Sequence, residues 1–198
     1  MTLNMQVPII GLTGKAGAGK DTVANYACSL LLERGISANK IACADKLKSV
    51  CFDLFGTAFG VSSEAFYGSQ IEKETLLEAV PGWSGRRILQ FVGTECFRSI
   101  HPLVWSTYVV NQAKINLANG YKAVFISDVR FLTESKAIHE AGGIVIRVKR
   151  PEADERHSTH ASETELLQIK EDYVIDNGGR ELYLLKELVR EFLCQLNF

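Results

Sequence analysis

A glycine-rich segment ending in a lysine is the part of the chain with the clearest potential for chemistry. Its residues run Gly14-Lys15-Ala16-Gly17-Ala18-Gly19-Lys20-Asp21-Thr22. The glycines allow successive backbone N–H groups to point into one hollow, a following helix start adds partial positive charge, and Lys20 adds a full one. Such a hollow suits the phosphates of a nucleoside triphosphate. The segment therefore predicts a phosphate-binding loop of the type G-x-x-x-x-G-K-[ST].

The flanking elements favour this interpretation. An apolar run over 8–13 predicts a strand before the loop, and residues 20–33 predict a helix after it that stops at Gly35. The loop departs from the usual pattern at Asp21, which stands where Ser or Thr usually holds magnesium. Either Thr22 supplies the hydroxyl, or Asp21 contributes to the metal through water. Lys20 is expected to be an exposed charge.

Composition excludes several other classes of function. The chain has 198 residues, of which 46% are hydrophobic and 23% charged, with a net charge of −1. This balance offers no electrostatic case for a nucleic-acid or membrane surface, and no apolar run approaches the roughly 20 residues that span a bilayer. The five cysteines include no C-x-x-C pair, which fits a reducing compartment. We expect a cytoplasmic protein without a signal peptide.

The remaining pattern alternates short strands with helices. Strands are expected at 8–13, 40–44, 121–127, 143–148 and 173–176, which predicts an α/β fold with a five-stranded parallel sheet flanked by helices. Residues 1–44 and 119–198 would form the core of this fold. A helical segment at 45–118 looks like an inserted substrate-binding subdomain, and the polar stretch at 150–163 looks like a short lid.

Charged residues follow two of the expected strands, where open α/β sheets bind ligands. Asp45 and Lys46 follow the second strand, either as substrate ligands or as a solvated helix start. Asp128 and Arg130 follow the third strand and, lying two residues apart, point the same way. Glu134 falls one helical turn from Arg130 and is expected to pair with it. The alternative is a helix N-terminus that simply prefers acidic residues.

A triphosphate cradle with a second helical site and a lid is the layout of a small-molecule kinase. Phosphoryl transfer needs mainly positioning and charge neutralisation. Lys20 would serve the donor β- and γ-phosphates. Other cations are expected at an acceptor phosphate (Arg86, Arg87 and Arg130) and around the lid (Arg147, Arg150 and Arg156).

Three motifs carry a resemblance to a known family. They are the loop at 14–22, Leu-Gln-Phe-Val-Gly-Thr-Glu at 89–95, and Asp-Val-Arg-Phe-Leu-Thr-Glu at 128–134. Together with His-Ser-Thr-His-Ala-Ser-Glu at 157–163 and Ile-Asp-Asn-Gly-Gly at 175–179, they resemble the phage-type deoxynucleoside monophosphate kinases. The match runs over nearly the whole chain in the right order. The loop occurs in many families, whereas the second and third motifs are specific.

The resemblance implies ATP- and magnesium-dependent phosphorylation of deoxynucleoside monophosphates to diphosphates, for DNA precursor synthesis. ATP and magnesium would be served by Lys20, Asp21 and Thr22, and the adenine would be bordered by Asn177 and Gly178. The acceptor site would comprise Arg86, Arg87, Gln90, Gly93, Thr94 and Trp105. Asp128, Arg130 and Glu134 would hold the acceptor or order the catalytic centre. Gln90 can adapt to several base edges, and Trp105 or Phe91 could stack on a base or simply pack a helix.

Two other functions fit the same residues less fully. One is a related kinase with another small acceptor, such as dephospho-coenzyme A or phosphomevalonate, since acceptor choice lies in residues 45–118. The other is a regulatory module that binds a nucleotide without transferring phosphate. The expected partners are therefore small molecules, and the sequence leaves a homodimer open.

Overall fold

The computed structural model describes residues 7–151, 164–178, 181–196 and 198. In chain order the elements are β1 (Ile9–Thr13), α1 (Lys20–Glu33), β2 (Ala38–Ile41), α2 (Cys43–Phe59), α3 (Glu64–Tyr67), α4 (Gln70–Glu74), α5 (Gly85–Gln90), η1 (Phe91–Arg98), α6 (Val104–Ala118), β3 (Ala123–Val129), α7 (Leu132–Glu140), β4 (Ile144–Lys149), η2 (Leu166–Gln168), β5 (Tyr173–Asp176) and α10 (Leu182–Gln195). Of the expected lid, Arg156 and the motif at 157–163 lie outside the described residues.

The five strands form one parallel sheet in the order β2-β3-β1-β4-β5. This confirms the predicted fold class, a five-stranded parallel sheet flanked by helices. The first strand lies at the centre of the sheet, between β3 and β4. The glycine-rich segment that follows β1 is therefore placed at the carboxyl edge of the central strand, where open α/β sheets bind ligands.

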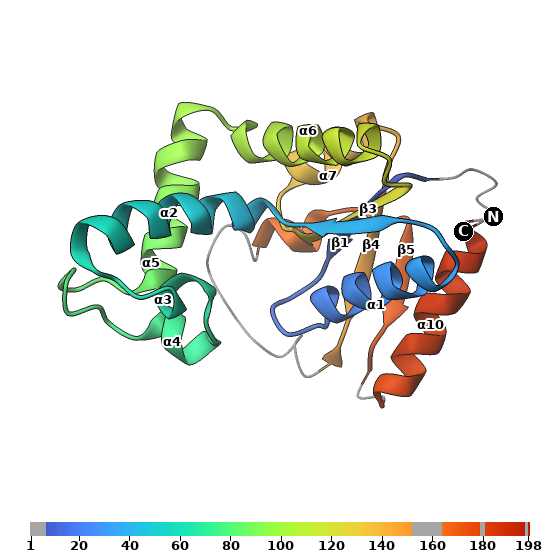
Figure 1. The fold of residues 1–198 in the computed structure, drawn as a ribbon, viewed down its shortest axis with the longest axis horizontal. Coiled ribbons are helices and arrows are strands. Elements are labelled where there is room, and N and C mark those ends of the chain that lie inside the picture. The colour runs from blue at the N-terminus through green and yellow to red at the C-terminus, as the bar shows by residue number, and fades with distance from the viewer. Residues whose placement is uncertain (1–6, 152–163, 179–180, 197) are drawn as a thin grey trace. The chain divides into compact units, whose positions relative to one another are not determined.

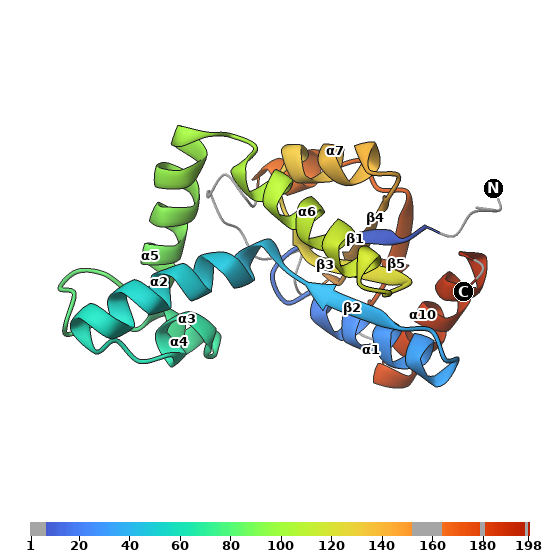
Figure 2. The same ribbon diagram turned by 45° about the horizontal axis from the view of Figure 1, so that its top comes forward.

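Helices cover both faces of the sheet: α1 and α10 on one, α6 and α7 on the other (Figures 1 and 2). Because strand side chains alternate between faces, Ile10 and Leu12 of β1 point toward α1 and α10 and are fully buried there with Leu31 and Phe192. This cluster fixes the start of α1 relative to the end of β1. It thereby holds the two ends of the glycine-rich loop.

The chain folds into two compact units, one formed by the described residues up to Ala42 and from Ser106 onward, the other by Cys43–Trp105. The second unit has its own core, with Phe66 and Ile88 at its centre. Within it, Gly85 brings the start of α5 so close to α3 that an added Cβ would lie 1.7 Å from a backbone oxygen. The expected insertion, 45–118, is longer than this unit because most of α6 belongs with the sheet.

Three expected boundaries were wrong. The second strand ends at Ile41 and α2 begins at Cys43, so Asp45 and Lys46 lie in the first helical turn, where an acidic residue favours the helix dipole. The third strand extends to Val129 and includes Asp128 within it. In the sequence, Gly93 and Thr94 predict an interruption of the helix that precedes them, but the structure has a π-helical stretch there, η1, that continues directly from α5.

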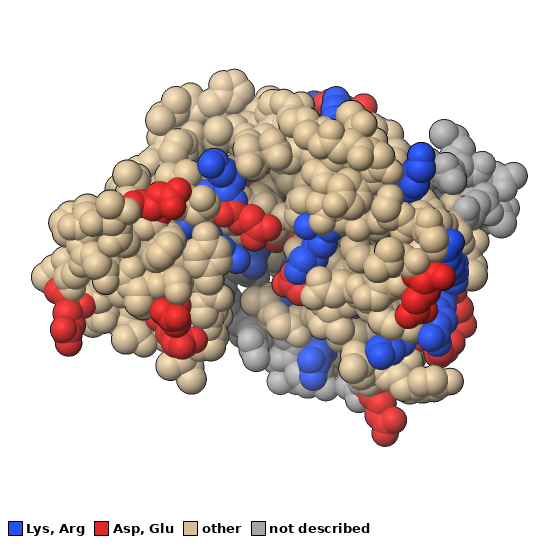
Figure 3. Space-filling model, viewed as in Figure 1, with Lys and Arg blue, Asp and Glu red and all other residues tan. Residues whose placement is uncertain are grey.

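Among the described residues, no helix is long and apolar enough to cross a membrane. On the face drawn in Figure 3, acidic and basic side chains are interspersed over α1 and α10. An ion pair between Arg190 and Glu187 on α10 is one example. Charges of both signs are thus mixed on this side of the sheet.

Candidate active site

The loop between β1 and α1 has the backbone that phosphate binding requires. Gly14, Gly17 and Gly19 all have positive φ, at 138°, 85° and 99°, a conformation that side chains with a Cβ rarely adopt. An added Cβ on Gly14 would lie 2.3 Å from the Val148 carbonyl oxygen, so the loop also packs directly against β4. Gly19 forms the N-cap of α1 without a side-chain cap. The first-turn N–H groups of α1 therefore lack intrahelical acceptors and suit an anion.

Lys20 lies over this loop. Its side chain is only 7% exposed, and its Nζ donates to the Gly14 oxygen at 2.6 Å and the Lys15 oxygen at 2.9 Å. The expectation of an exposed charge is therefore wrong, because the loop backbone wraps around the ammonium. A buried cation held by two carbonyls at the mouth of a helix is well placed to attract a phosphate group.

Asp21 is tied to β2 and β3, the two strands on one side of β1. Its Oδ1 accepts hydrogen bonds from Lys40 Nζ of β2 at 2.9 Å and from Ser127 Oγ of β3 at 3.1 Å. Partial burial opposes ionisation of this carboxyl, but the hydrogen bond and charge of Lys40, with help from Ser127 and Lys20, lower its pKa below the ordinary value. Asp21 is thus held as a carboxylate at the start of α1.

Lys40 and Ser127 were not predicted as site residues. Lys40 was interpreted only as the beginning of a strand, and Ser127 only as the end of one. The structure places Lys40 near the carboxyl end of β2 instead, and the carboxyl ends of parallel strands meet at one edge of the sheet. Recognising its partner required the strand order, in which β2 lies beside β3.

The end of β3 lies directly beside the strand that leads into the loop. Thr13, the last residue of β1, is in register with Val129 of β3. Asp128 and Arg130, on either side of Val129, are half-buried. The loop and the strand end predicted to face a second substrate are therefore neighbours at the same edge of the sheet.

Glu134 caps the start of α7, in line with the helix N-terminus alternative, while its side-chain pairing with Arg130 stays a prediction. It is 2% exposed, and its Oε2 accepts from the backbone N–H groups of Arg130 at 2.8 Å and Phe131 at 3.1 Å. The carboxylate thus caps the N-terminus of α7 and fixes the backbone at the end of β3. The first residue of α7, Leu132, also donates its N–H to Glu165 Oε2 at 3.3 Å. Two carboxylates therefore hold the turn that presents Arg130.

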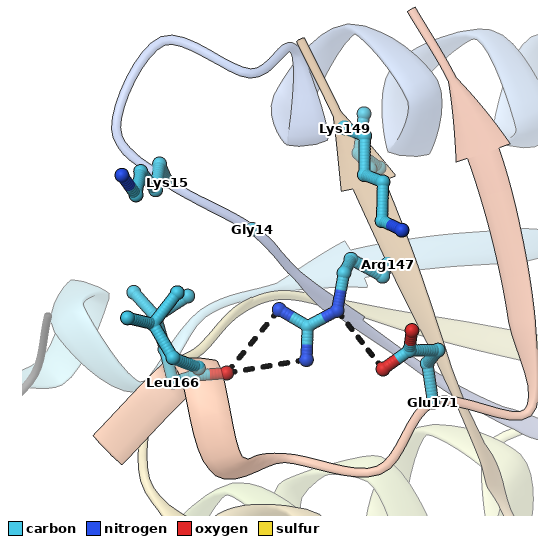
Figure 4. Close-up of a pocket in the computed structure, with 8 residues that line it drawn as sticks. Gly14, Lys15, Arg147, Lys149, Leu166 and Glu171 are labelled. Atoms are coloured by element: carbon cyan, nitrogen blue, oxygen red, sulfur yellow. Dashed lines mark hydrogen bonds and ion pairs between the residues drawn. The ribbon is translucent and has the colours of Figure 1, made fainter. Parts of the chain in front are cut away.

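A pocket of about 250 Å³ opens beside the loop (Figure 4). Its lining comes from the loop, from the end of β4, and from the segment around η2: Gly14, Lys15, Arg147, Val148, Lys149, Leu166, Leu167 and Glu171. Arg147, expected near the lid, is 9% exposed and donates from Nε to Glu171 at 2.9 Å and from both terminal nitrogens to the Leu166 oxygen at 3.2 Å. Its guanidinium fastens η2 to β4. Arg150, by contrast, is exposed at the end of the strand.

Asn177 follows β5 and reaches the phosphate-binding loop. Its side chain is buried, and Nδ2 donates to the Ala18 oxygen at 2.9 Å. Gly178, expected beside it at the adenine, donates its backbone N–H to Asp176 Oδ1 at 2.9 Å. The turn after β5 is thereby held next to the loop.

The expected acceptor residues lie in the second unit, on α2, α5 and η1. Arg86 contacts Gln70 and Glu74 of α4, at 2.5 Å and 3.4 Å. Arg87 donates to the Gly82 oxygen at 2.9 Å and stacks over the Trp83 ring at 4.7 Å. Gln90 ends α5, and Gly93 and Thr94 lie in η1. Asp45 and Lys46 are exposed in the first turn of α2.

Trp105 supports the π-helical stretch from within the unit. It is 7% exposed, its Nε1 donates to the Gly93 oxygen at 2.8 Å, and its ring meets Phe97 edge-on at 5.4 Å. Gly93 itself has no room for a Cβ, which would lie 2.7 Å from a Leu47 methyl. Packing, one of the two alternatives for Trp105, accounts for these contacts.

The parallel sheet, the glycine loop on its central strand and the helix start behind the loop define a P-loop nucleotide-binding fold. A family model described as deoxynucleotide monophosphate kinase matches residues 57–188. A protein of Acanthamoeba polyphaga mimivirus, assigned as a deoxynucleotide monophosphate kinase, is 36% identical over 95% of this chain and 93% of its own length. The chain therefore belongs to the deoxynucleotide monophosphate kinase family, and it is a phosphotransferase.

Solved structures of other small-molecule kinases are similar over most of the chain. The Mycobacterium tuberculosis APS kinase CysC in complex with AMPPNP and APS is 16% identical, with a TM-score of 0.48 over 98% of this chain and 99% of the other. Shikimate kinase from Acinetobacter baumannii in complex with shikimate is 16% identical, with a TM-score of 0.47 over 94% and 91%. The family assignment rests on the family model and the mimivirus protein, and these structures are not needed for it.

Proposed function

We propose that the enzyme transfers the γ-phosphoryl group of ATP to a deoxynucleoside monophosphate, giving ADP and the deoxynucleoside diphosphate. A phosphate oxygen of the acceptor forms the new P–O bond, and the bond between the γ-phosphorus and the β,γ-bridging oxygen breaks. The observation that carries the proposal is the register of Thr13 with Val129. This register brings the loop after Thr13 and Arg130 after Val129 to the same edge of the sheet.

The loop is proposed to hold the donor phosphates. Its backbone N–H groups and those of the first turn of α1 would bind phosphate oxygens, and Lys20 would neutralise the charge that develops between the β- and γ-phosphates. In this role the Lys20 ammonium would exchange its bonds to the Gly14 and Lys15 carbonyls for bonds to phosphate. The loop segment concerned comprises Gly14, Lys15, Ala16, Gly17, Ala18 and Gly19.

Magnesium fits the oxygen donors at this place. Asp21 presents a carboxylate whose side chain is 71% exposed, Thr22 is an exposed residue that carries a hydroxyl, and Asp128 lies at the end of β3. Magnesium prefers such hard oxygen ligands and usually takes only one or two from the protein, with the rest from phosphates and water. Within the described ranges no group of three or more His, Cys, Asp or Glu side chains forms a metal cage. A bound Mg²⁺ would neutralise phosphate charge.

The acceptor is proposed to bind through cationic side chains. Arg130 would hold the acceptor phosphate, with Glu134 fixing its backbone, and Arg86 and Arg87 would contribute from the second unit. Gln90, Gly93 and Thr94 would line the base site, with Asp45 and Lys46 near it, and Arg150 and Arg156 would belong to the lid. Trp105 would act by supporting Gly93. The contacts of the Arg86 side chain with Gln70 and Glu74 limit its conformational freedom and hold the guanidinium in place.

A cytoplasmic location is part of the proposal. All five cysteines are free thiols, as expected in a reducing compartment. Burial raises the pKa of Cys28 and Cys51 to about 11, which keeps these thiols protonated and unreactive at neutral pH.

An acceptor panel tests the proposed reaction. The enzyme is incubated with ATP, Mg²⁺ and, separately, each deoxynucleoside monophosphate, its ribonucleotide counterpart, dephospho-coenzyme A or phosphomevalonate, and the products are separated by ion-exchange chromatography. We expect deoxynucleoside diphosphates and ADP in equal amounts. Phosphorylation of only another acceptor would favour a related kinase, and nucleotide binding without any product would favour a regulatory module.

A further inference from the structure

The amide of Asn177 is built into the phosphate-binding loop from outside it. Asn177 is 8% exposed, and its Nδ2 donates to the Ala18 oxygen across 2.9 Å in a buried hydrogen bond. Its own backbone N–H donates to the Lys149 oxygen at 2.7 Å. The residue therefore links the end of β4 to the far side of the loop.

This hydrogen bond fixes the direction of a loop N–H group. In a trans peptide unit, the C=O of one residue and the N–H of the next point in opposite directions. Because the Ala18 carbonyl points at Asn177, the N–H of Gly19 points to the opposite side of the peptide, away from Asn177. Rotation of this one peptide would reverse the directions of a loop donor and a loop acceptor together, so the hydrogen bond to Asn177 fixes both.

The contact between the loop and the Asn177 amide requires both a glycine at position 19 and an uncharged donor at position 177. Gly19 approaches the amide so tightly that a Cβ would lie 2.8 Å from Asn177 Nδ2. The asparagine amide supplies a donor without a charge, so it neither competes with Lys20 nor repels phosphate. The turn that carries it is braced by the Gly178 N–H bond to Asp176. The amide is thus held at the loop by both the sheet and its own turn.

We propose that Asn177 is a positioning residue that shapes the phosphate-binding loop, and that it does not recognise the adenine base. It acts through the Ala18–Gly19 peptide and does not itself touch the phosphates. The inference rests on one part of the proposed function, namely that the loop binds the donor phosphates.

Binding of inorganic tripolyphosphate separates the two roles, because this ligand has the phosphates of ATP but no base. We would measure its Kd and that of ATP by calorimetry for the wild type and for Asn177→Leu, which has the same number of side-chain heavy atoms and no donor. Asn177→Ala provides a smaller second variant if the first fails to fold. Asn39→Leu is the matched control, because Asn39 Nδ2 donates to Asn116 Oδ1 at 2.7 Å in the same unit.

We expect both Asn177 variants to bind tripolyphosphate and ATP about tenfold more weakly, and by the same factor for each ligand. The Asn39 control should lose thermal stability while keeping both affinities. A loss of affinity for ATP alone, with tripolyphosphate binding unchanged, would overturn the inference in favour of base recognition. Unchanged binding of both ligands would overturn it as well. Failure of the wild type to bind either ligand would instead contradict the proposed function, so the two failures are distinguishable.

Discussion

The Asp21 carboxylate lies 2.9 Å from the Lys40 ammonium, so the residue after the loop lysine is paired with a cation from the edge strand β2. The same oxygen accepts from Ser127. One carboxylate therefore joins the start of α1 to β2 and β3. This connection holds the loop helix against the strand end that carries Asp128.

Replacing Lys40 with methionine should raise the pKa of Asp21 toward its ordinary value of 3.8. The pKa of Asp21 is lower in the folded protein than in the unfolded chain. The pair with Lys40 therefore stabilises the protein at any pH above the ordinary pKa of Asp21, and this stabilisation is lost as the pH falls through the folded-state pKa. The Asp21 side chain is 71% exposed, so the loss of stability at pH 7 should stay below about 1 kcal/mol. An NMR titration of the side-chain carboxylates, with chemical denaturation at pH 7, measures both.

Lys136→Met is the control for this change, because Lys136 makes an exposed pair with Glu140 on α7. It should leave the Asp21 titration unaltered. An Asp21 titration curve that is the same with and without Lys40 would contradict the assigned pairing.

Lys20→Ala should reduce kcat by at least about 100-fold, because it removes the cation proposed to stabilise the transferring phosphoryl group. It should also cost about 1–3 kcal/mol of stability, since two loop carbonyls lose a buried charged donor. Steady-state kinetics and thermal unfolding test the two effects separately. Normal turnover in a folded variant would refute the proposed role of Lys20.

Arg130→Ala should lower kcat/KM for the acceptor by about 100-fold, the order expected for loss of a guanidinium–phosphate contact. The Kd for ATP, measured by calorimetry, should change by less than about threefold if Arg130 serves only the acceptor. Lys136→Ala removes an exposed cation from the neighbouring helix α7 and should alter neither value. A large loss of ATP affinity in the Arg130 variant would move this residue to the donor site.

Trp105→Phe should destabilise the second unit by about 1–3 kcal/mol, because the Gly93 oxygen loses its indole donor and the smaller ring leaves a space. The relative rates with different deoxynucleoside monophosphates should not change. Trp83→Phe is the comparison, since the half-buried Trp83 packs beside Phe91 and Arg87, and its cost in stability should be smaller. A changed order of acceptors after the Trp105 substitution would restore base stacking as its role.

Much of the fold could be predicted because its signals are local. The apolar run before Gly14 and the helix signal from Lys20 to Glu33 depend on neighbouring residues, and α1 has these same ends. Strand ends were harder to place. Cys43 and Ala44 read as a continuation of a strand, but they begin α2, and an apolar pair alone does not distinguish the two.

The part of the candidate site that could be located from the sequence is the glycine-rich loop, whose residue types are recognisable within one short segment. The spacing of the glycines and the lysine after them identify the loop without knowledge of the rest of the chain, and the structure gives Gly14, Gly17 and Gly19 positive φ. The pairing of Lys40 with Asp21, and the contact of Asn177 with Ala18, join residues 19 and 159 positions apart. Such contacts follow from the order of the strands, which a sequence pattern does not specify. The burial of Lys20 and Trp105 likewise depends on tertiary packing.

A bisubstrate analogue, with adenosine and a deoxynucleoside joined through five phosphates, tests the central claim that the loop and Arg130 serve one crevice. Linking two ligands makes the second binding step intramolecular. We predict that calorimetry will give a Kd for the analogue at least about 100-fold lower than for ATP, and that Arg130→Ala will return it to the value for ATP. Binding of the analogue no tighter than ATP, in a wild type that binds both substrates, would contradict the account.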